Sequence, residues 1–138
     1  MDMDRFVEEF QIGRTVTLKR TFQQSDFERF AALSGDDNPI HVDPEFSART
    51  RFGKTVAHGM LLYSVIWAAL RTYFPDGTQA RQQLMFPSPT FAGEEVTVCV
   101  QVLEAHPEER WARLETKMTK PSGDVACQGE TLVRWNET

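Results

Sequence analysis

The stretch that decides the fold is GMLLYSVIWAALRTYF, residues 59–74. Wound as a helix it is apolar on nearly every side, and a helix of that kind is buried in a core instead of lying on a surface. The sequence PDG, residues 75–77, follows and ends it. Its apolar run is too short to span a bilayer. We therefore expect one long helix at the centre of a globular domain.

The chain after this helix carries the alternating pattern of strands. Every second position of one stretch is valine, at Val96, Val98, Val100 and Val102. Residues 113–118 alternate in the same way, 121–124 (PSGD) indicate a turn, and 125–135 return as a final strand. Residues 81–86 are a weaker strand candidate. Because strand side chains point alternately to opposite faces, the valines should line the core side of a sheet.

A strand and a short helix are predicted near the start of the chain. Residues 12–21 have the β-branched content of a strand or an extended arm. Ser25 and Glu28 form a capping-box pattern, in which each side chain satisfies an early backbone N–H. A short amphipathic helix should run from there to about residue 34, and Gly35 should end it.

A second short helix is predicted to begin at Pro44, with Asp43 as its N-cap, and to reach about Arg49. The order is then two small helices, one buried helix and an antiparallel meander of about four strands. A sheet that covers an apolar helix must curl around it. We predict an α+β fold in a single domain, residues 1–138, because the sequence contains no repeat, linker or low-complexity segment.

The charge and cysteine content limit the classes of function. The formal net charge is -5 and basic runs do not exceed two residues, which gives a nucleic-acid or membrane partner little electrostatic support. Cys99 and Cys127 lie in no metal-type spacing and are expected to be free thiols. The acidic N-terminus lacks the pattern of a signal peptide. We therefore expect a cytoplasmic protein.

The stretch SGDDNPIH, residues 34–41, allows two interpretations. Asp, Asn, Gly and Pro after a helix are standard turn formers, so the stretch can be a simple turn. Alternatively, Asp36 and His41 could converge on one small site, because the Asn38–Pro39 pair between them restricts the backbone. A carboxylate and an imidazole around a shared water form a general acid/base pair. Asn38 is a neutral amide suited to fixing a neighbouring side chain or loop.

The residues just before the long helix suggest a second element of a site. In Ala57-His58-Gly59-Met60 the backbone N–H groups at the helix start have no helical acceptor, and glycine lets a ligand oxygen come close. Such a group can serve as the oxyanion hole for a thioester carbonyl. For His58 itself, positioning of the helix start is favoured over catalysis.

Two segments of the chain resemble a known family. FAALSGDDNPIHVDPEFSARTRFGKTVAHGML (30–61) is similar to the hydratase motif of the MaoC-like, (R)-specific enoyl-CoA hydratases, which have the hotdog fold. FPSPTFAGEEV (86–96) resembles the family's segment with a proline followed by a Gly-acid pair. The signature is D-x-N-P-x-H followed by V-A-H-G-M, and the similarity covers most of the chain.

The resemblance implies a fold, a reaction and the residues of a site. The expected fold is a curved antiparallel sheet wrapped around a long central helix, in a homodimer or a dimer of dimers. The expected reaction is reversible addition of water to trans-2-enoyl-CoA, giving (R)-3-hydroxyacyl-CoA. Asp36 and His41 match the catalytic pair, Gly59 the N–H that holds the thioester oxygen, and Asn38 the supporting amide. Asn38 and His58 are assigned to substrate binding. No separate cofactor is expected, because coenzyme A is part of the substrate.

Several alternatives stay open at this stage. The same chemistry could run as a dehydratase on a carrier-protein or specialised acyl-CoA thioester, although an acidic surface would repel an acidic carrier and favours CoA. A thioesterase or a non-catalytic acyl-binding protein is less consistent with the intact Asp36/His41 pair. No metal is expected, since no further His or Cys completes a ligand set. Asp37 is either solvated or close enough to Asp36 to raise one carboxyl pKa. The coenzyme's phosphates would need cations, and the nearest basic residues are Arg49, Arg51 and Lys54, which we interpret as a solvated face.

Overall fold

One antiparallel sheet and one long helix organise the chain. The computed structural model describes residues 3–135, so the predicted domain, 1–138, extends beyond them at both ends. The elements are, in order, α1 (Met3–Glu9), β1 (Thr15–Thr21), α2 (Gln24–Ser34), α3 (Pro39–Val42), α4 (Pro44–Ala48), α5 (Gly59–Tyr73), β2 (Gly77–Gln82), β3 (Glu95–His106), β4 (Trp111–Thr119) and β5 (Val125–Trp135).

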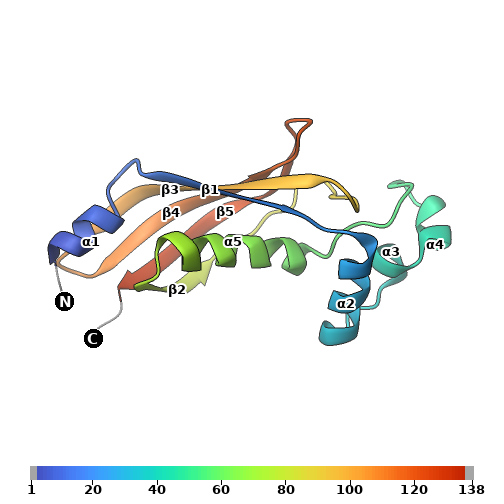
Figure 1. Ribbon diagram of the computed structural model, residues 1–138, viewed down its shortest axis with the longest axis horizontal. Helices are drawn as coiled ribbons and strands as arrows, with labels where there is room; N and C mark the ends of the chain where they lie inside the picture. Colours follow the sequence, from blue (N-terminus) through green and yellow to red (C-terminus); the bar gives the residue numbers. More distant parts are fainter. Residues whose placement is uncertain (1–2, 136–138) are drawn as a thin grey trace.

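The sheet has the strand order β1-β3-β4-β5-β2, with every neighbouring pair antiparallel. It curves around α5, which runs along the length of the sheet (Figure 1). The predicted α+β fold, a curved antiparallel sheet around a long central helix, is confirmed. Among the described residues no helix is long and apolar enough to cross a membrane.

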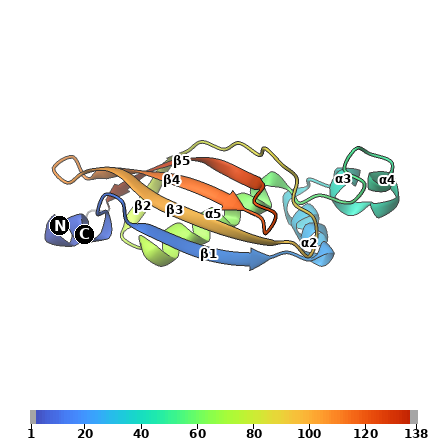
Figure 2. The ribbon, with the colours of Figure 1, turned by 90° about the horizontal axis from the view of Figure 1, so that it is seen from above.

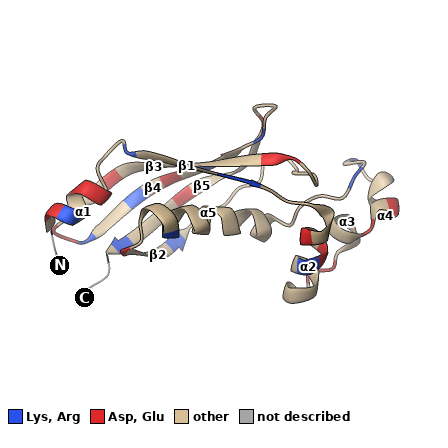
Figure 3. Cartoon of the chain, viewed as in Figure 1, with Lys and Arg blue, Asp and Glu red and all other residues tan. Residues whose placement is uncertain are grey.

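The core lies between α5 and the inner face of the sheet. All the alternating valines of β3 are buried, as their pattern predicted. The buried side chains of α5 are Leu61, Leu62, Val65, Ile66, Ala69 and Leu70. The prediction that α5 is buried on every side is wrong, however, because Met60 is 53% and Trp67 50% exposed. The sheet covers one face of this nearly uncharged helix (Figure 3) and leaves the face with Met60, Ser64 and Trp67 open.

The start of α2 differs from the prediction. The N-cap is Gln23, whose backbone N–H donates to Asp26 Oδ2 at 2.8 Å, so the box of Ser25 and Glu28 was placed two residues too late. An acidic side chain three residues after the cap can reach back to the cap N–H, and Asp26 satisfies that spacing. The predicted end of the helix is confirmed, since Gly35 has φ 81°. The helix that starts at Pro44, capped by Asp43, is also confirmed.

Two elements were mispredicted for identifiable reasons. The strand expected at 81–86 lies at Gly77–Gln82 instead, where Gln79 and Gln82 turn polar side chains inward and bond Thr131 and Thr116. Polar residues in the interior hid the alternation on which the prediction relied.

The N-terminal helix α1 was not predicted. It buries Phe6, and Phe10 follows it into the core; both rings make edge contacts with Trp135, at 5.4 and 5.6 Å between centroids. Met3, Phe6, Val7 and Phe10 do have helical spacing, so the sequence carried the signal and the prediction overlooked it.

Helices α2, α3 and α4 extend from one end of the sheet, opposite to α1 (Figures 1 and 2). The chain returns from α4 through residues 49–58 and enters α5 at Gly59. On the way, Val56 N–H donates to the Ile40 carbonyl at 3.0 Å, which ties the returning loop to α3. The turn at 34–41 is thereby held beside the N-terminal end of α5.

Candidate active site

The stretch 34–41 is a turn that brings an acid and an imidazole together. After Gly35 ends α2, Asn38 caps α3: its Oδ1 accepts from Ile40 N–H at 3.2 Å, and its carbonyl accepts from His41 N–H at 2.9 Å. Asp36 Oδ2 then lies 3.8 Å from His41 Nε2. The two interpretations of this stretch are therefore compatible, because the turn is what places the two side chains.

One hydrogen bond fixes how the His41 ring faces Asp36. His41 Nδ1 lies 2.7 Å from the Val56 carbonyl oxygen, which can only accept, so Nδ1 carries the hydrogen. In the neutral ring Nε2 then has a free lone pair and points to the carboxylate. The His41 side chain is 14% exposed and that of Asp36 53%. A water molecule can thus reach the space between two acceptors, as a general base requires.

His58 lies directly behind this pair. Its ring stacks on that of His41, with 3.8 Å between centroids and 24° between planes, and Phe30 packs 4.7 Å away. Its Nε2–H donates to the Asp36 carbonyl at 2.8 Å. With a side chain only 1% exposed, His58 contacts both members of the pair, and this geometry suits a positioning residue.

Burial keeps the His58 ring neutral. Desolvation lowers its pKa, and the neighbouring His41 lowers it further, while the bond to the Asp36 backbone acts in the opposite direction. Because Nε2 carries the hydrogen, Nδ1 is left bare, and it has no hydrogen-bond partner within residues 3–135. The stack on His41 therefore pairs two rings without adding a second charge beside the carboxylate.

Gly59 supplies a backbone donor at the start of α5. It is the first residue of the helix, so its N–H has no acceptor within the helix and lies at the positive end of the helix dipole. The Phe86 ring packs against it so closely that a Cβ at this position would lie 2.8 Å from the ring. Glycine is thus required both for the approach of a ligand oxygen and for the position of Phe86.

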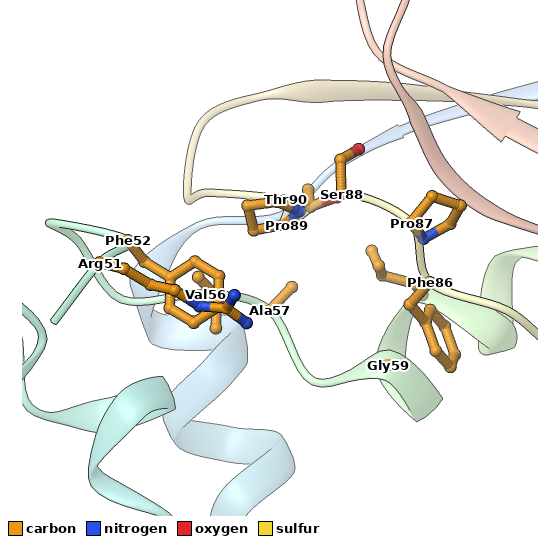
Figure 4. Close-up of a pocket in the computed structure, with 11 residues that line it drawn as sticks. Arg51, Phe52, Val56, Ala57, Gly59, Phe86, Pro87, Ser88, Pro89 and Thr90 are labelled. Atoms are coloured by element: carbon orange, nitrogen blue, oxygen red, sulfur yellow. The ribbon is translucent and has the colours of Figure 1, made fainter.

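A cavity of about 260 Å³ leads to this donor. Two loops, 51–57 and 86–90, form its walls together with Gly59 at the start of α5 (Figure 4), and Leu62 also lines it. The loops are joined by the bond from Ala57 N–H to the Thr90 carbonyl, at 2.8 Å. Asp36 and His41 do not line the cavity themselves. They lie next to it, because Val56 lines the cavity and its carbonyl accepts a hydrogen bond from His41, which faces Asp36.

Interactions beyond the cavity hold the second loop. The nearly buried Lys120 donates from Nζ to the Pro89 carbonyl at 2.7 Å and pairs with Glu94 at 3.2 Å. Ser88 Oγ donates to the Val125 carbonyl at 2.6 Å. These bonds hold Ser88 and Pro89 against the start of β5 and the residue that follows β4.

Two further expectations concern Asp37 and a possible metal ion. Asp37 is exposed, which corresponds to the solvated alternative. The groups of Asp36, His41 and His58 that could bind a metal lie within 4.8 Å of one another, and a catalytic zinc site needs only three protein ligands. One nitrogen of each ring, His58 Nε2 and His41 Nδ1, is already bonded to a backbone carbonyl. The absence of a metal stays a prediction.

Sequence reasoning missed three features of the site. The Val56 carbonyl sets the His41 tautomer, and a backbone acceptor leaves no signature in a sequence. Phe86 covers Gly59 from a distant segment, and no local pattern indicates that contact. Arg51, interpreted as part of a solvated face, lines the cavity.

Comparison with known proteins places this geometry in a family. The sequence model described as a MaoC-like domain matches residues 8–122. The chain is 40% identical over 132 residues to a 3-hydroxybutyryl-CoA dehydratase of Methylorubrum extorquens, covering 94% of this chain and 83% of the relative. It is 36% identical over 126 residues to an (R)-specific enoyl-CoA hydratase of Aeromonas caviae, covering 90% of this chain and 94% of the relative.

A solved structure agrees with the sequence comparison. That of an (R)-hydratase from A. caviae superimposes with a TM-score of 0.87 at 35% identity, over 91% of this chain and 97% of the other. The family match covers more than half of the chain, and the relatives are above 30% identity over nearly all of it. The chain has the hotdog fold and belongs to the MaoC-like family of hydro-lyases.

Proposed function

We propose that the protein is an (R)-specific enoyl-CoA hydratase, which adds water reversibly to trans-2-enoyl-CoA and gives (R)-3-hydroxyacyl-CoA. The observation that carries the proposal is the pair of Asp36 Oδ2 and His41 Nε2, 3.8 Å apart, beside a cavity that ends at the free N–H of Gly59. Hydration of an enoyl thioester needs a base for the water and a donor for the carbonyl oxygen. The names of both relatives support the same chemistry.

In this proposal the carboxylate and the imidazole each accept one hydrogen of a water molecule. The water oxygen bonds to C3, its proton passes to the pair, and the electrons of the double bond move towards the thioester oxygen. A proton from the pair then bonds to C2, so Asp36 and His41 end as they began. The charged oxygen accepts from Gly59 N–H. Acid/base catalysis contributes about 10²–10⁴-fold, and one oxyanion donor on the order of 10²–10³-fold.

The Gly59→Ala variant should lower kcat by about tenfold to a hundredfold, because a displacement of roughly 1 Å in a reacting geometry has effects of that size. The new Cβ would lie 2.8 Å from the Phe86 ring, so the ring or the helix start must move. Phe86 is 42% exposed and can swing outwards, so the thermal unfolding temperature should change little. The double variant Gly59→Ala/Phe86→Ala should recover part of the rate. An unchanged kcat in Gly59→Ala would contradict this role.

The proposed function is tested by the loss of enoyl absorbance when purified protein meets crotonyl-CoA. A four-carbon substrate is the first choice because one relative is named for 3-hydroxybutyryl-CoA. The product is then passed to an (R)-selective 3-hydroxyacyl-CoA dehydrogenase. Rapid loss of absorbance with a product that this enzyme oxidises would support the proposal. No loss with crotonyl-CoA or with longer enoyl-CoAs would contradict it.

A second candidate is the same site working as a 3-hydroxyacyl dehydratase on a carrier-protein or specialised acyl-CoA thioester. Carrier proteins are acidic, and a net charge of -5 on this chain would weaken such an encounter. The charge balance thus favours CoA.

A purely acyl-binding role is the third candidate, and turnover of any thioester would exclude it. Because coenzyme A belongs to the substrate, we propose that no separate cofactor and no metal take part.

The surface of α5 and the two cysteines bear on how the protein assembles and where it works. The open face of α5 exposes two large apolar side chains, Met60 and Trp67, that a second copy could cover, so we propose a homodimer, alone or as a dimer of dimers. Cys99 and Cys127 are both free, and burial raises the pKa of the Cys127 thiol to about 11, which makes it unreactive. Free thiols suit a reducing compartment, and we propose the cytoplasm.

A further inference from the structure

The cavity that ends at Gly59 carries one charge on its wall. Of the described residues that line it, Arg51 is the only charged one. Figure 4 shows its side chain reaching from the loop before α5 towards Ala57. The guanidinium carbon lies 4.7 Å from the centroid of the Phe52 ring. Stacking on an aromatic ring restricts the guanidinium and leaves its edge of N–H donors available.

Arg51 has no carboxylate partner within ion-pair distance in the described part of the chain. The chain contains 20 Asp and Glu against 15 Lys and Arg, yet none of the described carboxylates reaches Arg51. Arg29, by contrast, pairs with Asp26 and Arg113 with Glu104. The acid of the opposite loop, Glu94, is already bound to Lys120. The positive charge at the cavity is therefore free to bind an anion of a ligand.

A second polar group on the same wall is unsatisfied. Thr90 is 2% exposed, and its Oγ1 has no hydrogen-bond partner among the described residues. A buried hydroxyl without a partner is costly unless a ligand supplies one. Its neighbours Pro87 and Pro89, which also line the cavity, have no backbone N–H to offer. Thr90 is thus well suited to bond an amide in a ligand that lies between the two loops.

We propose that Arg51 binds the phosphate of a phosphopantetheine arm and that Thr90 bonds one of its amides. The proposal rests on the proposed function and deepens it. The thioester carbonyl lies at Gly59 N–H, the arm follows the cavity between residues 51–57 and 86–90, and the phosphate meets Arg51 where the cavity opens. A guanidinium can bind phosphate through two parallel N–H bonds. Coenzyme A and acyl carrier proteins both present this group, so the chemistry is shared by two sources.

The test compares thioesters with and without phosphate. In Arg51→Gln, KM for crotonyl-CoA should rise about tenfold, the lower end of what a charge-assisted bond contributes, because the site is open to solvent. KM for crotonyl-pantetheine, which lacks phosphate, should not change, and kcat should be the same for both substrates. The rise should shrink at high salt, which screens exposed charges. The matched control is Arg134→Gln, an exposed arginine near the end of β5, at the opposite end of the molecule from α4 (Figure 1).

Two further measurements distinguish CoA from a carrier protein as the source of the phosphate, and phosphate binding from hydratase activity. A rise in KM with crotonyl-CoA assigns the phosphate to CoA, and a rise only with the crotonyl carrier-protein thioester assigns it to the carrier. Titration calorimetry of coenzyme A itself needs no turnover: Arg51→Gln should weaken binding about tenfold even if hydration fails. The inference would be overturned by equal rises with crotonyl-CoA and crotonyl-pantetheine. An unchanged KM for every phosphate-bearing substrate, together with an unchanged affinity for coenzyme A, would also overturn it.

Discussion

Asp36→Asn should lower kcat by about 10²–10⁴-fold, the range that general acid/base catalysis contributes, while the protein stays folded. The amide has the shape of the carboxylate but cannot take a proton from water. The contacts that build the turn use the Asp36 backbone: its N–H donates to Ser34 Oγ at 3.1 Å and its carbonyl accepts from His58 at 2.8 Å. Asparagine keeps both bonds. Measurement of kcat with crotonyl-CoA, together with a thermal unfolding curve, checks the two halves of this prediction.

The neighbouring carboxylate provides the matched control. Asp37→Asn removes the same charge one residue away, from a side chain that is exposed to solvent. It should retain most of the wild-type kcat, because a solvated carboxylate contributes little at this distance. If Asp36→Asn kept more than half of the rate, or if both variants lost activity equally, Asp36 would not be the group that handles the proton.

The central helix and the valine strand show why most of the fold could be predicted. Residues 59–74 are so uniformly apolar, and the valines of β3 so regular, that few arrangements other than a helix under a sheet bury both. Prediction failed where tertiary contacts override local pattern. Strand β2 turns Gln79 and Gln82 inward, where Thr131 and Thr116 satisfy them. No apolar alternation signals such a strand.

The candidate site was predictable only in part, for a different reason. The turn formers and the glycine at the helix start have local signatures, and the resemblance assigned roles to Asp36, His41 and Gly59. The position of His41 depends on a carbonyl at Val56, and the close packing at Gly59 depends on Phe86. Both contacts join segments far apart in the chain. Local patterns contain no information about which distant backbone atom faces a side chain.

His41→Ala should also lower kcat by about 10²–10⁴-fold, because it removes the second acceptor for the water. The fold should survive, since the His41 imidazole is mostly buried but does not belong to the apolar core. Free imidazole added to the assay should restore part of the rate. The side chain is 14% exposed, so truncation leaves a space that a small base can enter. The dependence of kcat on imidazole concentration checks this prediction.

The adjacent histidine separates a catalytic from a positioning role. His58→Gln keeps a side-chain N–H for the Asp36 carbonyl but loses the stack on His41. It should lower kcat by only about tenfold, since a loosened geometry has smaller effects than a missing base, and added imidazole should not restore it. Because burial lowers the His58 pKa, its ring stays neutral as the pH falls to values at which an ordinary histidine is protonated. Any decline of kcat/KM that the unaltered protein shows at acid pH should therefore persist in His58→Gln. Rescue of His58→Gln by imidazole, or failure to rescue His41→Ala with normal folding, would reverse the two assignments.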